Sequence, residues 1–288
     1  GNYTNNNPWN TIVNIDSNGF RSNGILKNID SDQKIIIFVG DSYTFGDGVD
    51  DQNTFPALFQ KLINKKVVNS GVSGYGLDQI YLKSIDLLKR YDVSEIFFCF
   101  IPDDIKRTHY SVYNGLKKPY FELDQAKLKH TEINEISVAK MGEKYESITN
   151  YSLLFHLLKV KLFNQYWYSP TMIGVKSEHK NGVEVSIKLI NQLKDFCDQK
   201  NVKLYVVPLM SHPINQSKLF YPRFEEKIKQ VLKGINNDIS IINVYEKFAL
   251  IKEYSLDTLQ TFYSENFLHF NLKGNNFVAK SIHSATVE

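Results

Sequence analysis

The chain has 288 residues, of which 42% are hydrophobic and 23% charged, and its formal net charge is +3. This length suits one large α/β domain or two small ones, with enough apolar material for a buried core. The small net charge and the lack of a Lys/Arg block argue against a nucleic-acid-binding protein. The longest apolar runs, 35–39 and 96–101, are far shorter than the ~18 residues that a membrane-spanning helix requires, so we expect no membrane span.

The start of the chain and its cysteines leave the compartment open. The sequence begins Gly1-Asn2-Tyr3, with neither a Met nor a recognisable signal peptide. This start leaves room for a removed signal or membrane anchor, and thus for an exported or periplasmic protein. Two cysteines do not make a disulfide framework, and we expect Cys99 and Cys197 to be small core residues. The oligomeric state is also left open.

From residue 34 onward, apolar segments typical of strands alternate with segments of helical periodicity. Residues 1–33 are rich in Asn, Ser, Asp and Gly and are predicted to form an irregular leader with a turn at 17–19. Strands are predicted at 34–39, 67–69, 95–101, 203–207 and 239–244, and helices at 54–63, 77–91, 183–197, 224–232 and 272–282. This alternation predicts a single α/β domain over 34–288, with a doubly wound parallel sheet of five strands and right-handed crossovers.

Residues 105–180 interrupt the alternation. They are rich in aromatic residues and Lys, with one convincing helix near 153–163. A departure of this length is typical of an insertion, and we expect it to form a lid or one wall of a substrate cleft. Two interpretations of its aromatic residues stay open, a sugar-stacking surface or the core of the lid. These residues are Tyr110, Tyr113, Tyr120, Phe121, Tyr166, Trp167 and Tyr168.

The tripeptide Gly40-Asp41-Ser42 directly follows the first predicted strand. Open α/β sheets bind their ligands outside the carboxyl ends of the strands, which is where Ser42 falls. The small Gly40 allows a sharp turn that leaves the Ser42 hydroxyl accessible. Taken alone, Ser42 is also explained as a turn or capping residue, and Asp41 as an acceptor for loop N–H groups.

Three further segments bring chemically useful groups to the same edge of the sheet. A glycine-dense loop that includes Gly74 follows the second strand, Asp103 follows the third, and His269 precedes the last helix. A nucleophile, donors for an oxyanion and a base are the groups that acyl transfer requires. The structural alternatives are a turn glycine, a turn cap after Pro102 and a histidine that packs at the start of a helix.

Together, these segments resemble the four sequence blocks of the SGNH, or GDSL-type, serine hydrolases and acyltransferases. The blocks lie at 38–49, 67–76, 100–105 and 266–271. They occur in the family's order, and the match spans roughly residues 19–279. The upstream Asn18-Gly19-Phe20-Arg21 and the extended first block look like a bacterial branch of the family. The resemblance implies a flavodoxin-like sheet and the hydrolysis or transfer of ester-linked acyl groups, with no metal or organic cofactor.

The resemblance also implies a role for individual residues. Ser42 matches the nucleophile, and its backbone N–H is one oxyanion donor. Gly74 matches the glycine whose N–H is a second donor, and His269 matches the catalytic base. We therefore expect Ser42 Oγ within hydrogen-bond reach of an imidazole nitrogen of His269.

Two positions depart from the family's pattern. Asp103 stands where the family has the Asn that completes the oxyanion hole; an ionised Asp103 would repel an oxyanion, whereas a protonated one could donate to it. Asn266 stands where the family has the Asp that orients the base, with Glu265 before it. An Asn there can favour the wrong histidine tautomer, which costs roughly 10⁴-fold in rate in a serine protease. The resemblance also implies that a Ser-His pair supported by a backbone carbonyl can suffice.

The other histidines carry weaker signals. His212 follows the fourth predicted strand and is either a cleft residue or a packing residue. The remaining histidines show no paired metal spacing, and we interpret them as non-functional. They are His109, His130, His156, His179 and His283.

The sequence therefore predicts an SGNH-type enzyme that cleaves or transfers a small acyl ester, preferably an acetyl group on a carbohydrate. Ser42, His269 and Asn266 are the predicted catalytic residues. Ser42, Gly74 and Asp103 are predicted to surround the oxyanion. The alternative from another class is a catalytically weakened module that binds a glycan or a partner protein, with Asp103 and Asn266 as the marks of lost activity.

Overall fold

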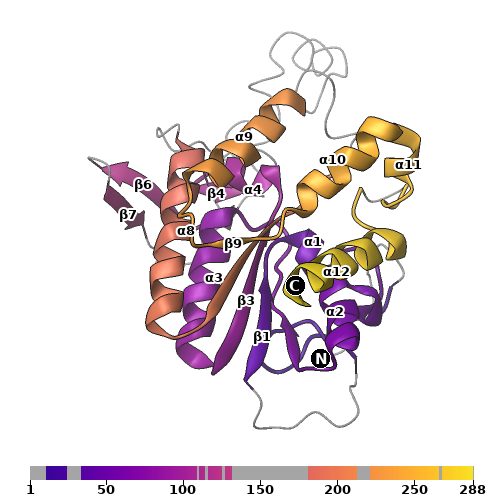
Figure 1. Cartoon of the computed structure of the whole chain (residues 1–288). Coiled ribbons are helices and arrows are strands. Elements are labelled where there is room, and N and C mark those ends of the chain that lie inside the picture. Colours follow the sequence, from indigo (N-terminus) through magenta and orange to yellow (C-terminus); the bar gives the residue numbers. More distant parts are fainter. Residues whose placement is uncertain are drawn as a thin grey trace, which may run out of the picture.

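The computed structural model describes residues 11–24, 34–108, 110–113, 116–124, 127–131, 181–212, 221–265 and 268–287. At its centre lies a sheet of five parallel strands in the order β2-β1-β3-β8-β9 (Figure 1). The strands are β1 (Ile35–Val39), β2 (Val67–Asn69), β3 (Val93–Phe100), β8 (Lys203–Pro208) and β9 (Ser240–Ile241). This is the flavodoxin-like order. The predicted doubly wound parallel sheet is confirmed.

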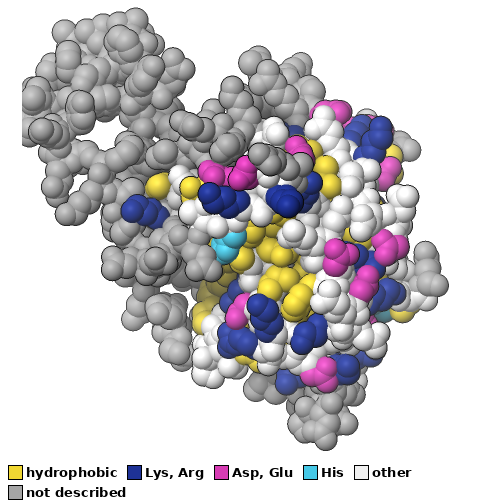
Figure 2. Space-filling model, turned by 90° about the vertical axis from the view of Figure 1, so that its left-hand side faces the viewer, with side chains coloured by type: hydrophobic (Ala, Val, Ile, Leu, Met, Phe, Trp, Pro, Cys, Tyr) yellow, Lys and Arg dark blue, Asp and Glu magenta, His cyan; other side chains and the backbone are white. Residues whose placement is uncertain are grey.

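Helices cover both faces of the sheet (Figure 1). On one face α3 (Leu77–Arg90) packs against α8 (Gly182–Gln199), and on the other α2 (Phe55–Ile63) packs against α12 (Leu272–Val287). The other long helices among the described residues are α9 (Tyr221–Gly234) and α10 (Val244–Tyr254), and α10 is followed by the short α11 (Leu256–Gln260). Figure 2 shows the α3–α8 side, where a strip of hydrophobic side chains is bordered by charged ones. Because helices cover both faces, every residue of β1 is buried.

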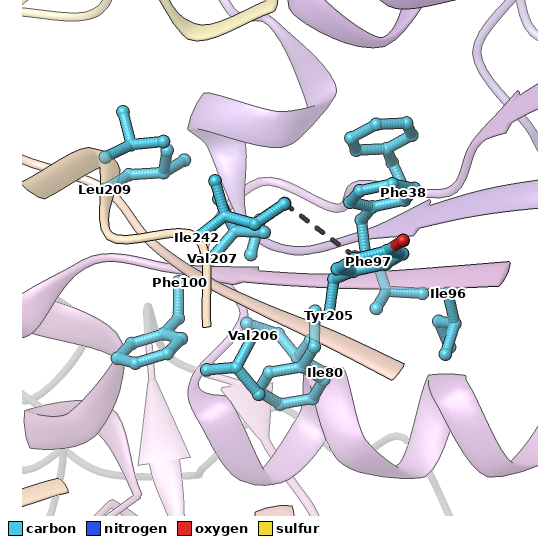
Figure 3. Packing of buried hydrophobic residues seen from close by; sticks show 14 of the residues in the cluster. Phe38, Ile80, Ile96, Phe97, Phe100, Tyr205, Val206, Val207, Leu209 and Ile242 are labelled. Atoms are coloured by element: carbon cyan, nitrogen blue, oxygen red, sulfur yellow. Dashed lines mark hydrogen bonds between the residues drawn. The ribbon is translucent and has the colours of Figure 1, made fainter. Parts of the chain in front are cut away.

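Three stacked aromatic rings cross the sheet within the core. The Phe97 ring of β3 lies between Phe38 of β1, at a centroid distance of 4.4 Å, and Tyr205 of β8, at 4.6 Å (Figure 3). The three residues are partners in the strand register, so their side chains point to the same face. Phe55 and Phe59 of α2 meet the Phe38 ring edge-on at 5.6 and 5.3 Å. These contacts anchor α2 to the strand that leads into the Gly-Asp-Ser turn.

The predicted elements differ from the structure mainly at their ends. The fifth strand is limited to β9 instead of spanning 239–244, because Asn243 caps α10 by accepting the Glu246 N–H at 3.1 Å. The third strand ends before Pro102, which opens the short helix α4 (Pro102–Arg107). Proline suits this position because the first helical turn has no partner for its N–H.

The first part of the insertion forms two small antiparallel hairpins. Their strands are β4 (Val112–Tyr113) with β5 (Leu116–Lys117), and β6 (Tyr120–Asp124) with β7 (Lys127–Thr131). Lys118 between the hairpins forms a buried ion pair with Asp78 of α3, and Phe121 packs edge-on against Tyr81 of the same helix at 5.7 Å. Both contacts fix the hairpins to α3. The helix predicted near 153–163 lies outside the described residues.

The leader contacts the sheet through Arg21. This residue forms isolated antiparallel bridges with Ile15 and with Asn69 of the edge strand β2. The predicted turn at 17–19 is present, with Gly19 at φ +81°, a conformation that favours glycine. The proposed division into a leader and one domain from residue 34 stays a prediction.

Within the part of the chain that the structure describes, no helix is both long and apolar enough to cross a membrane. The same residues include no group of three or more His, Cys, Asp or Glu side chains that could hold a metal ion. Cys99 and Cys197 are free and buried, as expected of core residues.

Candidate active site

Ser42 begins the short helix α1 (Ser42–Phe45), which follows β1 after a two-residue turn. Asp41 caps this helix, because its side chain accepts the Tyr43 N–H at 3.0 Å. Asp41 thus has the structural role considered for it. Gly40 must be small, since a Cβ there would overlap a side chain of α1. The turn places Ser42 at the carboxyl edge of the sheet.

His269 reaches Ser42 from the far end of the chain. Its Nε2 lies 2.9 Å from Ser42 Oγ, so the imidazole can accept the hydroxyl proton. The His269 carbonyl accepts the Ser264 N–H at 2.8 Å, which closes the loop before α12. The preceding residue, Leu268, has a left-handed φ of +57°, which costs a non-glycine residue about 1–2 kcal/mol. The conformation of Leu268 is therefore held by its contacts.

Four of the five predicted site residues line one cleft of about 370 Å³: Ser42, Gly74, Asp103 and His269. Ser42 follows β1 and Asp103 follows β3, the neighbouring strands between which a 2-1-3-4-5 sheet reverses its order. Such a switch point is the usual ligand site of this topology. Asn266, the fifth predicted residue, lies outside the described residues.

The glycine-rich loop lies directly on the Ser42 turn. The Val72 N–H donates to Gly40 O at 3.0 Å, and a Cβ at Gly71 would overlap the backbone nitrogen of Phe45. Gly74 has φ +84° and so adopts a backbone conformation that other residues avoid. The loop can approach Ser42 this closely because these positions carry no side chain.

A partly buried arginine joins three of the four blocks. Arg107 Nη1 lies 2.6 Å from Asp104 Oδ1 and 3.6 Å from Asp41 Oδ2, and it donates to Tyr75 O at 3.0 Å. Sequence reasoning missed Arg107. The available signal was its spacing, three residues after Asp104 in a segment that forms one helical turn.

The charges around Arg107 perturb one another. Burial and the neighbouring Asp41 raise the pKa of Asp104 well above its usual value. Burial also raises the pKa of Asp41, although Arg107 opposes that shift. Burial lowers the pKa of Arg107, but the two carboxyl groups outweigh this effect and raise it. The guanidinium therefore keeps its charge, and the two carboxyl groups compete for it.

Asp47 and Ser73 form a second polar pair in the cleft that the sequence analysis did not single out. Ser73 Oγ donates to Asp47 Oδ2 at 2.9 Å, and both residues line the cleft with His269. Burial raises the pKa of Asp47, while His269 lowers it. Their position in the first two blocks was the only sequence signal for them.

His212 is a packing residue, one of its two expected roles. It is buried, and its ring meets Tyr263 edge-on at 5.0 Å. Burial lowers the pKa of His212, and His269 lowers it further. The neighbouring Ser211, not His212, lines the cleft.

Two of the described aromatic residues of the insertion lie in different environments, and both interpretations of the set stay predictions. Tyr113 lines the cleft, and the Arg107 guanidinium lies 5.3 Å from its ring centroid. Phe121 is buried against α3 and belongs to the hydrophobic core. Tyr166, Trp167 and Tyr168 lie outside the described residues.

No protein-family model matches the sequence, and a search of curated proteins gives no match. Among solved structures, a member of the lipolytic protein G-D-S-L family from Veillonella parvula DSM 2008 aligns with 12% identity and a TM-score of 0.51, covering 89% of this chain and 100% of that one. LAE5, an α/β hydrolase enzyme from the metagenome of Lake Arreo, Spain, aligns with 10% identity and a TM-score of 0.51, covering 88% of this chain and 95% of that one. The chain has the SGNH hydrolase fold. At these identities the likeness concerns the fold, and the chemistry depends on the residues of the cleft.

Proposed function

We propose that this protein is a serine esterase or acyltransferase that acts on a small acyl ester, with an acetyl group on a carbohydrate as the preferred substrate. The observation that carries the proposal is the 2.9 Å distance between Ser42 Oγ and His269 Nε2. The cleft around this pair also contains Gly74 and Asp103. A hydroxyl within hydrogen-bond reach of an imidazole is the arrangement of an activated serine nucleophile.

In the proposed mechanism, His269 Nε2 takes the Ser42 proton as Oγ attacks the ester carbonyl carbon. The backbone N–H groups of Ser42 and Gly74 donate to the oxyanion that forms. Collapse of the intermediate breaks the ester bond, and the leaving alcohol takes the proton from His269. Water in a hydrolase, or an acceptor alcohol in a transferase, then attacks the acyl group on Ser42 with His269 as base. This second collapse returns the free serine.

Asp103 and Asn266 keep their proposed places in this scheme. Asp103 follows β3 and lines the same cleft. It stands where the family that the sequence resembles has the Asn that completes the oxyanion hole. A carboxylate there opposes the developing negative charge, whereas the nearby Arg107 offsets part of that opposition. We propose that Asn266 takes the role of the Asp that orients the base in the family that the sequence resembles.

Three features of the cleft support a small acyl group on a carbohydrate. The volume of about 370 Å³ accommodates one small ligand. Tyr113 offers an aromatic ring for a sugar face, and Asp47 and Ser73 offer hydrogen-bond partners for sugar hydroxyls. None of these groups is specific for one sugar, so the acceptor is defined only as a polyhydroxylated one.

The test is the release of p-nitrophenol from p-nitrophenyl acetate by the wild type, Ser42→Ala and Ser84→Ala. Ser84 is a buried serine of α3 whose hydroxyl donates to Ile80 O at 2.8 Å, so its replacement controls for the loss of a buried hydroxyl. We expect Ser42→Ala to lose activity by roughly 10³-fold or more, and Ser84→Ala to retain it. A fluorophosphonate should label the wild type and Ser84→Ala but not Ser42→Ala. Equal release by the wild type and Ser42→Ala would contradict the proposal.

The substrate class and the type of reaction need separate assays. Acetate release from acetylated saccharides, compared with acetylated linear alcohols, tests the preference for carbohydrates. Added glycerol distinguishes transfer from hydrolysis, because a transferase passes part of the acyl group from Ser42 to glycerol as a new ester.

A glycan-binding module is the second candidate, and the carboxyl group of Asp103 in the cleft favours it. This candidate predicts no fluorophosphonate labelling, together with saturable binding of a glycan by calorimetry. Binding should then weaken in Tyr113→Ala and remain unchanged in Ser42→Ala.

A further inference from the structure

The hydroxyl of Tyr43 joins the loops behind the Ser42–His269 pair. It donates to Leu268 O at 2.7 Å and accepts the His212 N–H at 2.9 Å. Leu268 directly precedes His269, whereas His212 belongs to the loop that follows β8. One side chain next to Ser42 therefore connects the nucleophile turn to two loops that are distant in sequence.

The ring of Tyr43 also contacts the base itself. The ring centroids of Tyr43 and His269 are 4.8 Å apart, and Phe270 meets the Tyr43 ring edge-on, also at 4.8 Å. Tyr43 is only 4% exposed, so packing fixes both the ring and the hydroxyl. Side chains of α1 thus contact His269 in two ways, through Ser42 Oγ and through the Tyr43 ring.

The backbone of Leu268 explains why such a contact is needed. Its φ of +57° is unfavourable for leucine and persists only where surrounding contacts hold it. Its carbonyl accepts from Tyr43, and its N–H donates to Ser264 O at 3.3 Å. The direction of the Leu268 carbonyl fixes the plane of the peptide that leads into His269. A bond to this carbonyl therefore acts on the position of the imidazole.

Tyr43 is also suited to remain a donor. Burial raises the pKa of Tyr43 well above its usual value. The hydroxyl therefore keeps its proton in neutral solution, and it can donate to a carbonyl while accepting from an N–H. The fourth letter of the G-D-S-L motif is leucine, a residue that could make neither hydrogen bond.

We propose that Tyr43 is a positioning residue for His269: its hydroxyl holds Leu268 in the conformation that aims Nε2 at Ser42 Oγ. The proposal rests on the proposed function in so far as His269 is taken to be the base. Its geometric part, the fixed orientation of the imidazole, is independent of any substrate.

The kinetic test compares Tyr43→Phe with Tyr263→Phe on p-nitrophenyl acetate. Tyr43→Phe keeps the ring and removes the hydroxyl, so we expect kcat to fall roughly tenfold while KM changes less than about twofold. Tyr263 is the matched control, because it is 3% exposed and its hydroxyl donates to a backbone oxygen of another loop, that of Met210, at 2.9 Å. Tyr263→Phe should lose similar stability and keep the wild-type kcat.

A second measurement does not depend on turnover. The Cε1–H resonance of His269, assigned with His269→Gln, should be a single sharp signal in the wild type and in Tyr263→Phe. In Tyr43→Phe it should broaden or split, because the imidazole then samples more than one orientation. An unchanged resonance in a folded Tyr43→Phe would overturn the positioning role. A wild type that releases no p-nitrophenol would refute the proposed function, while the resonance would still decide the role of Tyr43.

Discussion

Arg21, which is buried, and Arg107, which is partly buried, hold the loops around the nucleophile turn. Arg21 binds mainly to the backbone. Arg21 of the leader pairs with Asp51 at 3.0 Å. Its guanidinium also donates to the carbonyl oxygens of Phe45 at 2.9 Å, Gly46 at 2.6 Å and Val49 at 2.6 Å. Four acceptors from one loop surround a single cation. Arg21 therefore fixes the path of the chain that follows α1.

The second arginine binds mainly to charge. Arg107 pairs with Asp104 and Asp41, and a single bond to Tyr75 O is its backbone contact among those described above. Its side chain is 15% exposed and lines the cleft, whereas that of Arg21 is fully buried. Arg21 thus fixes the shape of the loop that follows α1, whereas Arg107 balances the charge of two carboxyl groups. Replacing either arginine should therefore lower the unfolding free energy by a similar amount, but the two losses should depend differently on pH.

The largest effect is expected from Arg107→Gln. It leaves two buried carboxyl groups without a cation, which should cost about 3–5 kcal/mol of unfolding free energy at pH 8. The loss should shrink at pH 5, because protonation of these groups removes the unpaired charge. Urea unfolding at both pH values measures it. Arg90→Gln, which removes an exposed ion pair with Asp86, is the control and should cost far less at both pH values.

Arg21→Lys should cost slightly less, about 2–4 kcal/mol, because an ammonium group cannot reach all four acceptors of the planar guanidinium. The charge opposite Asp51 is retained, so the loss should be the same at pH 5 and pH 8. The same urea titrations provide the measurement. A loss at Arg21 that varies with pH as strongly as the loss at Arg107 would break the distinction between shape and charge.

Asp103→Asn tests the charge of the cleft directly. A carboxamide replaces a carboxylate near the oxyanion and adds a donor, so kcat/KM on p-nitrophenyl acetate should rise about tenfold, or 1.4 kcal/mol. Asp92→Asn is the control, because Asp92 is exposed and pairs with Lys34 at 3.2 Å at the other end of β3. A slower Asp103→Asn variant would show that Asp103 does not stand in for the family's Asn.

Asp104→Asn should give the smallest effect, a weaker dependence of the unfolding free energy on pH. Because the pKa of Asp104 is raised in the folded state, the folded protein binds this proton more tightly than the unfolded chain does. The unfolding free energy should therefore fall as pH rises from the usual carboxyl range through the raised pKa. Asn does not titrate, so the melting temperature of the variant should vary less between pH 4 and pH 8. An equally steep profile would assign the titration to another group.

The sheet could be predicted because its signals are local. The apolar runs 35–39 and 96–101 are long enough to specify strands buried on both faces, and the intervening helices carry their own periodicity. The edge of the sheet was less predictable. β9 is only two residues long, since the cap at Asn243 starts a helix where hydrophobicity alone would continue the strand. The hairpins of the insertion were missed because short, half-exposed strands leave a weak pattern.

The residues of the site likewise divide into those that could be predicted from the sequence and those that could not. Residue type and order, together with the resemblance to the SGNH family, singled out Ser42, Gly74, Asp103 and His269, and the cleft contains all four. The same reasoning passed over Arg107 and Tyr43. An arginine three residues after an aspartate and a tyrosine after a serine are common, and their partners here lie in other loops.

By itself, the sequence determined which groups this protein has available for acyl chemistry and the alternating framework that carries them. The sequence encodes both locally, the framework through the periodicity of neighbouring residues and the reactive groups through the chemistry of each side chain. The resemblance led us to expect Ser42 within hydrogen-bond reach of His269, but only the tertiary structure brings these residues, 227 positions apart, to 2.9 Å. It also decided that one guanidinium serves two buried carboxyl groups. Such contacts depend on how packed layers bring distant loops to one edge of a sheet, and no local pattern in the chain encodes a distance of that kind.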